Sequence, residues 1–276
     1  MRFGVGISAV AMVLFGALLP PFAYGQTVDF TSLPEAQIVI LGEIHDNKYH
    51  HDNQALAIAS IAPKALVFEM LDPAQAEAAV GIDPTDKPAL EAALGWKNSG
   101  WPDFALYHPL FTAAPQARLY GAALPRDQVR RAFADGAATV FGLDAGRYGL
   151  LERLSPEEQA AREADQQAAH CNALPTEMLP GMVAAQRLRD AAFARTALEA
   201  LTETGGPVVV ITGSGHADKL RGIPVALAAA APQVSVLSVG QIEGDGDVPA
   251  GTFDLWLRSK ATPRGDPCAA FAQPPG

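Results

Sequence analysis

The sequence predicts an α/β fold in which a mostly parallel β-sheet is flanked by helices, with a helical insertion at about residues 145–204. Three observations support this prediction. Short, continuously apolar segments rich in Val, Ile and Leu recur along the chain, as in strands that are covered on both faces of a parallel sheet. Helical patterns separate most of these segments. One long stretch in the second half has helical patterns and no strand signal.

Six segments have the composition of buried strands. They are residues 36–42, 65–70, 117–124, 207–214, 233–240 and 253–258. A helix is expected after the first strand, where Asp46 or Asn47 is available as N-cap. Further helices are expected after the third strand, in "RDQVRRAFA", and between the fourth and fifth strands, in "RGIPVALAAAA". This alternation indicates layers of helices around a sheet.

The insertion at 145–204 is predicted to contain two helices. The first has Ser155 as N-cap, Pro156 at its first position and Glu158 at its third, which is a common start signal. The second, within residues 176–201, is long and amphipathic. We expect the insertion to lie over the edge of the sheet as a lid, or else to form an ordinary helical layer.

The N-terminus has the arrangement of a secretory signal peptide. One positive charge, Arg2, precedes a short apolar stretch, and small residues precede a plausible cleavage site after Gly25. No cysteine follows that site, so a lipid anchor is not expected, and no other apolar run is long enough to span a bilayer. We predict a signal peptide at 1–25, one α/β domain at 26–260 and a tail at 261–276, in a periplasmic or secreted protein.

Charge and cysteine content narrow the class of protein further. The formal net charge is −10 at pH 7, so the chain has no bulk positive charge with which to bind nucleic acid. The two cysteines, Cys171 and Cys268, are expected to pair in an oxidising compartment and to tie the tail to the body. Two free thiols are the alternative.

Ionisable residues follow four of the predicted strands. Glu43 and His45 follow the first strand, Glu69 the second, Arg126 the third and His216 the fourth. Because ligands bind at the carboxyl ends of parallel strands, we expect these groups to converge there. Converging charges compensate for one another's burial and shift one another's pKa values. The pattern therefore predicts a catalytic centre, or a divalent-metal site formed by Glu43, His45, Glu69 and His216.

Each of these residues also has a simpler interpretation. Glu43 can cap a helix, His216 can belong to the "GSGH" turn, and Arg126 can be a solvated charge at a helix start. Glu69 is the most informative, because a lone carboxylate in the apolar segment "LVFEM" is costly.

Two more histidines, His50 and His51, lie one helical turn beyond the first strand. We expect one of them to face the pocket and the other, with Asp52, to face solvent. Several standard motifs are absent: "HEXXH", paired "CxxC", a Walker loop, "GxSxG" and "CxxCH". The absence of "CxxCH" excludes the covalent attachment of a c-type haem.

Aromatic residues are concentrated in "GWKNSGWPDFALYHPLF", residues 95–111. This segment, which includes Trp101 and Tyr107, is expected either to form the wall of an apolar pocket for a flat ligand or to pack over the sheet edge.

Several of these segments resemble a known family. They are "ILGEIHDNKYHHDNQ", "LVFEM", "GWPDFALYHPLF", "AQRLRDAAFA" and "ITGSGHADKLRGIP". They resemble the ChaN family of haem-binding, iron-regulated proteins, in a superfamily with Tiki metalloproteases, TraB-like proteins and erythromycin esterases. The resemblance extends over residues 33–240. The residues that match shared motifs are Glu43, His45, Glu69, Arg126, Gln186, Asp190 and His216.

The resemblance implies non-covalent haem binding, a homodimer, a part in bacterial haem or iron uptake, and a tyrosine as iron ligand. Tyr148 is the first candidate for that ligand, with Tyr107 and Tyr120 as alternatives. Arg147 or Arg126 would hold the propionates, and Trp101 would supply apolar surface.

Two main hypotheses follow. The first is an exported haem-binding protein of haem or iron handling, which the resemblance to ChaN favours. The second is a metal-dependent or Glu/His-based hydrolase, an esterase or peptidase, which the strand-end residues favour on chemical grounds. A binding module for another flat ligand is a third possibility.

Overall fold

The computed structural model describes residues 1, 28–245, 248–266 and 268–269. Apart from Met1, the predicted signal peptide at 1–25 lies outside these residues.

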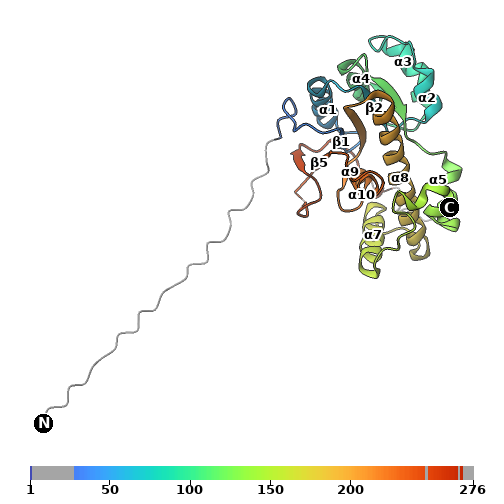
Figure 1. The fold of residues 1–276 in the computed structure, drawn as a ribbon, viewed down its shortest axis with the longest axis vertical. Coiled ribbons are helices and arrows are strands. Elements are labelled where there is room, and N and C mark those ends of the chain that lie inside the picture. Colours follow the sequence, from blue (N-terminus) through green and yellow to red (C-terminus); the bar gives the residue numbers. More distant parts are fainter. Residues whose placement is uncertain (2–27, 246–247, 267, 270–276) are drawn as a thin grey trace.

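A six-stranded parallel sheet forms the centre of the described structure (Figure 1). Its strands are β1 (Ile38–Glu43), β2 (Ala65–Phe68), β3 (Arg118–Gly121), β4 (Val208–Gly213), β5 (Val236–Glu243) and β6 (Leu255–Ser259). Their order across the sheet is β3-β2-β4-β1-β5-β6. The predicted α/β fold with a parallel sheet is therefore confirmed. The four strands with ionisable residues at their ends, β3, β2, β4 and β1, are consecutive neighbours.

The continuous apolar runs arise because both faces of the sheet are covered. In β1, Ile38 and Ile40 contact one hydrophobic core, while Val39 and Leu41 contact the other. Neighbouring β4 alternates in the same way, and its Val208 is in register with Ile38. Alternate residues thus enter opposite cores, so neither face of a strand is free to be polar.

One face of the sheet is covered by helices from the first half of the chain. They are α1 (Lys48–Ile61), α2 (Pro73–Ala78), α3 (Lys87–Ala93) and α4 (Phe104–Ala113), with the 3₁₀ turn η1 (Trp96–Asn98). Asn47 is the N-cap of α1, and its side chain accepts a 2.8 Å hydrogen bond from Tyr49 N. Much of the aromatic segment 95–111 is helical, and Phe104 and Phe111 of α4 are buried in this core.

The opposite face is covered by later helices, which lie together and apart from α1 and α4 (Figure 1). They are α5 (Arg126–Asp135), α6 (Ala137–Phe141), α8 (Leu179–Thr204), α9 (Ser214–Ala217) and α10 (Ile223–Ala230), with the 3₁₀ turns η2 (Leu143–Gly146) and η3 (Thr176–Met178). Helix α7 (Pro156–Ala169) packs on α8 and has no buried residue. The expectation of a lid over the sheet edge is wrong for α8. Its small residues, such as Ala191 and Ala194, are fully buried in the core beneath this face. Small side chains allow close contact with the strands, so α8 is an ordinary helical layer.

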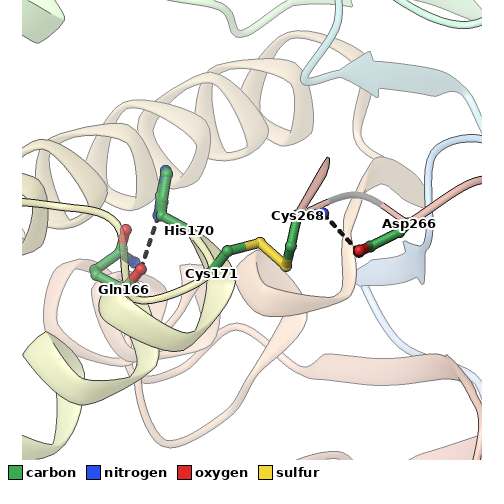
Figure 2. Close-up of a disulfide and its surroundings, with 5 residues drawn as sticks. All are labelled: Gln166, His170, Cys171, Asp266 and Cys268. Atoms are coloured by element: carbon green, nitrogen blue, oxygen red, sulfur yellow. Dashed lines mark hydrogen bonds between the residues drawn. A yellow bond between two sulfur atoms is a disulfide. The ribbon is translucent and has the colours of Figure 1, made fainter. Parts of the chain in front are cut away.

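The C-terminal segment crosses back toward α1. Residues 260–266 have no helix or strand, and Arg264 forms ion pairs with Asp46 and Glu243. Cys268 forms a disulfide with Cys171, which lies in the turn after α7 (Figure 2). The tail is therefore linked to the body by charge at one point and by a covalent bond at another.

Within the described residues, no helix combines the length and the apolarity needed to cross a membrane.

Candidate functional site

The ends of β1, β2 and β4 bring their charged residues together around Gly213. Glu43 ends β1, Glu69 directly follows β2, and His216 lies in α9, just after β4. A Cβ atom placed on Gly213 would lie 3.2 Å from His45 Nε2 and 3.7 Å from Glu69 Oε2. The absent side chain thus leaves the space in which the His45 ring and the Glu69 carboxylate approach each other.

Glu43 lies at the centre of the first part of this site. Its Oε1 accepts a 2.6 Å hydrogen bond from the Tyr107 hydroxyl and lies 2.9 Å from His45 Nδ1. His51 Nδ1 lies 3.4 Å from Glu43 Oε2, and neither of these two atoms has a hydrogen-bond partner among the described residues. His51 Nε2 donates to the His45 carbonyl at 2.9 Å. A buried carboxylate is therefore enclosed by two imidazoles and one phenol from three different elements.

This environment alters the protonation of its members. Burial lowers the pKa of His45, but the hydrogen bond to Glu43 and the charges of Glu69 and Glu43 outweigh it, so that the pKa is raised. Burial and the Glu43 charge raise the pKa of the Tyr107 hydroxyl far above its usual range. At neutral pH, Tyr107 is therefore a hydrogen-bond donor, and the neighbouring carboxylates stabilise the protonated form of His45 relative to a free imidazole.

Glu69 is the centre of the second part. Its Oε2 accepts hydrogen bonds from Thr212 Oγ1 at 2.7 Å and from Gly213 N at 2.8 Å. Its Oε1 lies 3.6 Å from His216 Nε2 and 3.8 Å from Arg189 Nη2. Burial acts to raise the pKa of Glu69, but the neighbouring cations and these hydrogen bonds hold it below its usual value. The lone carboxylate predicted from "LVFEM" is thus an ionised, buried group with compensating partners.

His216 connects Glu69 to α8. Its Nδ1 lies 2.6 Å from Asp190 Oδ1, and the Gln186 side-chain amide lies 3.1 Å from the same nitrogen. The ring also contacts Phe193 edge-on, with 4.9 Å between the ring centroids. Burial lowers the pKa of His216, but Glu69 and Asp190 raise it above its usual value. His216 therefore lies between two carboxylates, Glu69 and Asp190, which favour its protonated form.

An open groove of about 670 Å³ lies in front of Glu69. Its walls include Trp101 from the segment before α4, Arg126 from α5, and Phe193 and Arg189 from α8. The Trp101 ring contacts His45 edge-on, with 4.8 Å between centroids. Arg126 thus shares the groove with Glu69, while no contact joins it to the buried Glu43 or His216 groups.

The first candidate for a haem ligand is far less accessible than a surface phenol. Tyr148 is only 4% exposed and packs against Phe141, with 5.1 Å between ring centroids. Burial raises the pKa of its hydroxyl. Arg147 is exposed, and its guanidinium lies 5.6 Å from the centroid of the Tyr148 ring. This pair belongs to the helical insertion, not to the groove beside Glu69.

The two alternative tyrosines are engaged within the protein. Tyr107 is fully buried with its hydroxyl on Glu43, and the Tyr120 hydroxyl donates to Glu203 Oε2 at 2.9 Å. The structure therefore places Tyr107 with the catalytic candidates, whereas Trp101 lies on the groove.

The expectation that one histidine of the "HH" pair faces solvent with Asp52 is wrong. His50 is 0% exposed and His51 is 1% exposed, while Asp52 is exposed. His50 Nδ1 accepts a hydrogen bond from Ile44 N at 2.8 Å, and its Nε2 lies 2.6 Å from Ser259 Oγ. Both ring nitrogens of His50 thus have partners, whereas in His51 only Nε2 has a hydrogen-bond partner within the described residues. His51 therefore joins the Glu43 cluster, and His50 anchors the loop before α1.

The sequence did not single out Thr212 or Arg189 as site residues, and it identified Asp190 and Gln186 only through motif resemblance. Asp190 and Gln186 are four residues apart, so they share one face of α8. Asp190 falls among buried alanines of that helix, which is the signal that periodicity offers for it. Thr212 has no such signal, because a threonine in an apolar strand is ordinary.

The described residues contain no group of three or more His, Cys, Asp or Glu side chains that could hold a metal ion. The interpretation of Glu43, His45, Glu69 and His216 as one divalent-metal site is therefore not supported. Glu43 and Glu69 are instead engaged with protein donors.

The comparisons with known proteins agree with this architecture. The family model described as "Haem-binding uptake, Tiki superfamily, ChaN" matches residues 30–227. No curated protein matches the chain significantly.

Two solved structures are similar to this chain. One, titled "Cofacial heme binding to ChaN of Campylobacter jejuni", is 19% identical, covers 80% of this chain and 86% of its own, and has a TM-score of 0.61. The type III effector HopBA1 is 12% identical, covers 82% of this chain and 88% of its own, and has a TM-score of 0.46. The family match spans most of the sheet and the site, and the chain belongs to the ChaN family of haem-binding uptake proteins, within the Tiki superfamily.

Proposed function

We propose that this protein binds haem non-covalently and that it serves in the uptake or handling of haem or iron. The observation that carries the proposal is the open groove of about 670 Å³ beside Glu69. A haem needs apolar surface for its ring and cations for its propionates. The groove offers Trp101 and Leu124, both half-buried, for the first need and Arg126 and Arg189 for the second, and the family match supports the same ligand.

A titration with hemin tests this proposal directly. We expect a saturable Soret band that differs from that of free hemin in the same buffer. Replacing Trp101 with Ala should weaken binding, because it removes apolar surface from the groove. A spectrum that stays that of free hemin at all protein concentrations would exclude haem binding.

Tyr148 is the iron ligand that the resemblance favours. Because its ring is buried, the test uses a substitution that keeps the ring. Tyr148→Phe keeps the ring and removes only the hydroxyl, so the core should remain intact. If the hydroxyl binds iron, the absorption spectrum of the ferric complex will change in this variant. An unchanged spectrum and affinity would rule out Tyr148 as the ligand. Tyr148 lines a separate pocket of about 200 Å³ and not the groove beside Glu69, so ligation by Tyr148 would place the haem there.

We further propose that the protein acts outside the cytoplasm, as a homodimer. The signal-peptide pattern at 1–25 supports export, and the Cys171–Cys268 disulfide fits an oxidising compartment. Fractionation of cells that express the full chain, with a variant lacking residues 2–25 as control, tests export. Sedimentation with and without hemin tests the dimer, and a single monomeric species under both conditions would exclude it.

A Glu/His-based hydrolase that acts on an ester or a peptide is the second candidate function. One observation favours it: buried Glu43 holds His45 through Nδ1, while 34% of the His45 side chain remains exposed beside Glu69. A carboxylate that orients a partly exposed imidazole is suited to removing a proton from water. Any hydrolysis should be lost in His45→Gln and in Glu43→Gln. Activity that persists in both folded variants, and that chelators leave unchanged, would exclude this function.

A further inference from the structure

The end of the chain forms a strap across the loop between β1 and α1. The strap is defined as residues 260–266 together with Cys268. Its Arg264 donates from Nη2 to Asp46 Oδ1 at 2.6 Å and from Nε to Asp46 Oδ2 at 2.9 Å, so both carboxylate oxygens of Asp46 are engaged. Asp46 directly follows His45, and the strap therefore binds this loop beside a residue of the candidate site.

Further contacts between the strap and the loop involve the backbone. Thr262 Oγ1 donates to the Asp46 carbonyl at 3.3 Å, and Asn47 Nδ2 donates to the Lys260 carbonyl at 2.9 Å. Asn47 is also the N-cap of α1, so the strap reaches the point where that helix begins. The outer side of the loop is thus fixed by the strap, while 34% of the His45 side chain on the same loop remains exposed.

The two cysteines of the disulfide are held in different ways (Figure 2). Cys171 lies in the turn after α7, where its N–H donates to the Ala168 carbonyl at 3.1 Å. On the strap, Cys268 N donates to Asp266 Oδ1 at 2.8 Å. Within the described residues, the hydrogen bonds of Asp266 and Cys268 are local, to each other and to Ala269. If the disulfide is opened, the turn keeps Cys171 in place, whereas Cys268 is free to move away.

The disulfide is open to attack by a dithiol. Cys171 and Cys268 are both half-buried, and residues 263–266 beside them are exposed. Exposed disulfides are the ones that exchange readily with thiols. A thiolate of the dithiol attacks one sulfur, forms a mixed disulfide and releases the other cysteine, which takes up a proton. The second thiolate then breaks the mixed disulfide, so the protein gains two electrons and two protons while the dithiol is oxidised to a disulfide.

We propose that the strap is a redox-controlled clamp on the loop that carries His45, and that its partner is an exported protein with a reactive pair of thiols. While Cys171 and Cys268 are joined, the strap holds this loop in place. After reduction, the strap is attached through exposed polar contacts such as those of Arg264, which are weak. The loop then opens more often, so the oxidation state sets how rigidly His45 is held. The strap lies outside the family match to residues 30–227, and this inference does not depend on haem binding.

Hydrogen exchange of the full chain, read by mass spectrometry, tests the clamp. The protein is compared before and after incubation with dithiothreitol in the absence of denaturant, and alkylation of the thiols reports the extent of reduction. We expect the amides of residues 44–50 to exchange about fivefold faster after reduction, the factor that the loss of one or two exposed polar contacts gives. Labelling times are kept short, so that the amides of β4, residues 208–213, remain protected in both states and show that the protein stays folded.

A variant without the disulfide checks that the reductant acts through this bond. Cys171→Ser combined with Cys268→Ser should show the exchange of the reduced protein at residues 44–50, with no further change in dithiothreitol. Equal exchange of this segment in the oxidised and reduced wild type would overturn the inference. A disulfide that dithiothreitol reduces only when β4 loses its protection would overturn it as well, because the bond would then be a purely structural one.

A second variant keeps the disulfide and removes the contacts of the strap. Thr262→Val combined with Arg264→Ala loses the hydrogen bonds to Asp46, so residues 44–50 should exchange rapidly whether or not the disulfide is reduced. Lys219→Ala, which removes an exposed ion pair outside the strap, is the matched control and should keep the redox response of the wild type. If reduction still accelerates exchange of residues 44–50 in the strap variant, the effect does not pass through the strap and the inference is wrong.

Discussion

Two charged clusters lie at the carboxyl edge of the same sheet, and they differ in their exposure to water. The site cluster, defined by Glu43, Glu69 and His216, is almost completely buried, at 2%, 4% and 5% exposure. The tail cluster, defined by Asp46, Glu243 and Arg264, includes an Arg264 side chain that is 34% exposed. Similar residue types thus operate in two different dielectric environments.

In the site cluster, each charge depends on its neighbours. Burial disfavours the ionised form of Glu69 and of His216, and only the opposite charge and the hydrogen-bond donors restore it. Removing one member leaves another charge buried and uncompensated. The cluster is therefore fixed in place and specific in its geometry, as a recognition or catalytic site requires.

In the tail cluster, water solvates part of the charged groups directly. Arg264 lowers the pKa of Glu243 to about 2, with smaller contributions from Thr262 and Asn47. Such an exposed network adds little stability by itself, because solvent and salt screen it. The tail is held mainly by the covalent link between Cys268 and Cys171. Burial, more than the number of ion pairs, therefore decides how much each charged group contributes to stability.

The largest expected effect concerns that covalent link. Replacing both Cys171 and Cys268 with Ser should lower the free energy of unfolding by about 4–5 kcal/mol, because the bond closes a loop with a sequence separation of 97 residues. Urea unfolding of the variant measures the loss, and the wild type in a dithiol reductant should show a similar one. A loss below about 1 kcal/mol would mean that the tail is held by its charges after all.

The second effect tests the buried cluster. Glu69→Ala should cost about 3–5 kcal/mol of unfolding free energy, since it leaves Thr212 and Gly213 without their acceptor and His216 with less compensation. Asp52→Ala, in the exposed i,i+4 pair with Lys48, is the control and should cost about 0.5 kcal/mol or less. Equal losses in the two variants would remove the distinction between buried and exposed charges.

The third effect is a pH dependence that arises from His50, which lies between the two clusters. Burial lowers its pKa from an ordinary 6.5 to about 4. As the pH falls from 6.5 to 4, His50 binds a proton in the unfolded chain but stays neutral in the folded chain. The free energy of unfolding therefore falls by about 3 kcal/mol across this window. His50→Gln lacks this component, and its stability should fall less steeply over the same range.

The difference between the wild-type and His50→Gln curves isolates this residue. His45 and His216 have raised pKa values, so their stabilisation is complete below pH 6.5 and is lost as the pH rises through their folded-state values. That opposite trend is common to both proteins. Parallel curves between pH 6.5 and 4 would contradict the buried, neutral state of His50.

The smallest effect concerns the exposed pairs of the tail. Arg264→Ala removes contacts to Asp46 and Glu243 and should cost about 1 kcal/mol or less while the disulfide is intact. The cost should shrink further in 1 M salt. Thermal melts at low and high salt measure it, and a salt-independent loss of several kcal/mol would place this network with the buried charges.

Several features of the site were predictable because they depend on local pattern. Apolar runs predicted the strands. Glu43, Glu69 and His216, which follow these runs, were predicted to converge at the strand ends, and the structure brings them together near Gly213. Residue types also predicted the N-caps, Ser155 for α7 and either Asp46 or Asn47 for α1, of which the structure has Asn47. These features follow from backbone geometry within a few residues.

Other features required knowledge of which segments are adjacent in space. His51 and Tyr107 are buried on Glu43 because α1 and α4 pack on the same face of the sheet. A local sequence pattern does not reveal such a contact between distant segments. Tyr148 was chosen as a ligand for its place in the insertion, yet the packing of α6 and η2 buries its ring. Exposure depends on the whole surrounding surface, so local pattern does not determine it.

The sequence by itself determined the strand-and-helix alternation, the acidic charge and the candidate residues at the strand ends, because each depends on near neighbours along the chain. Only the tertiary structure decided the strand order β3-β2-β4-β1-β5-β6, the burial of both His50 and His51, and the groove beside Glu69. These depend on contacts between residues far apart in the chain, where packing and desolvation select one arrangement among many that local preferences allow.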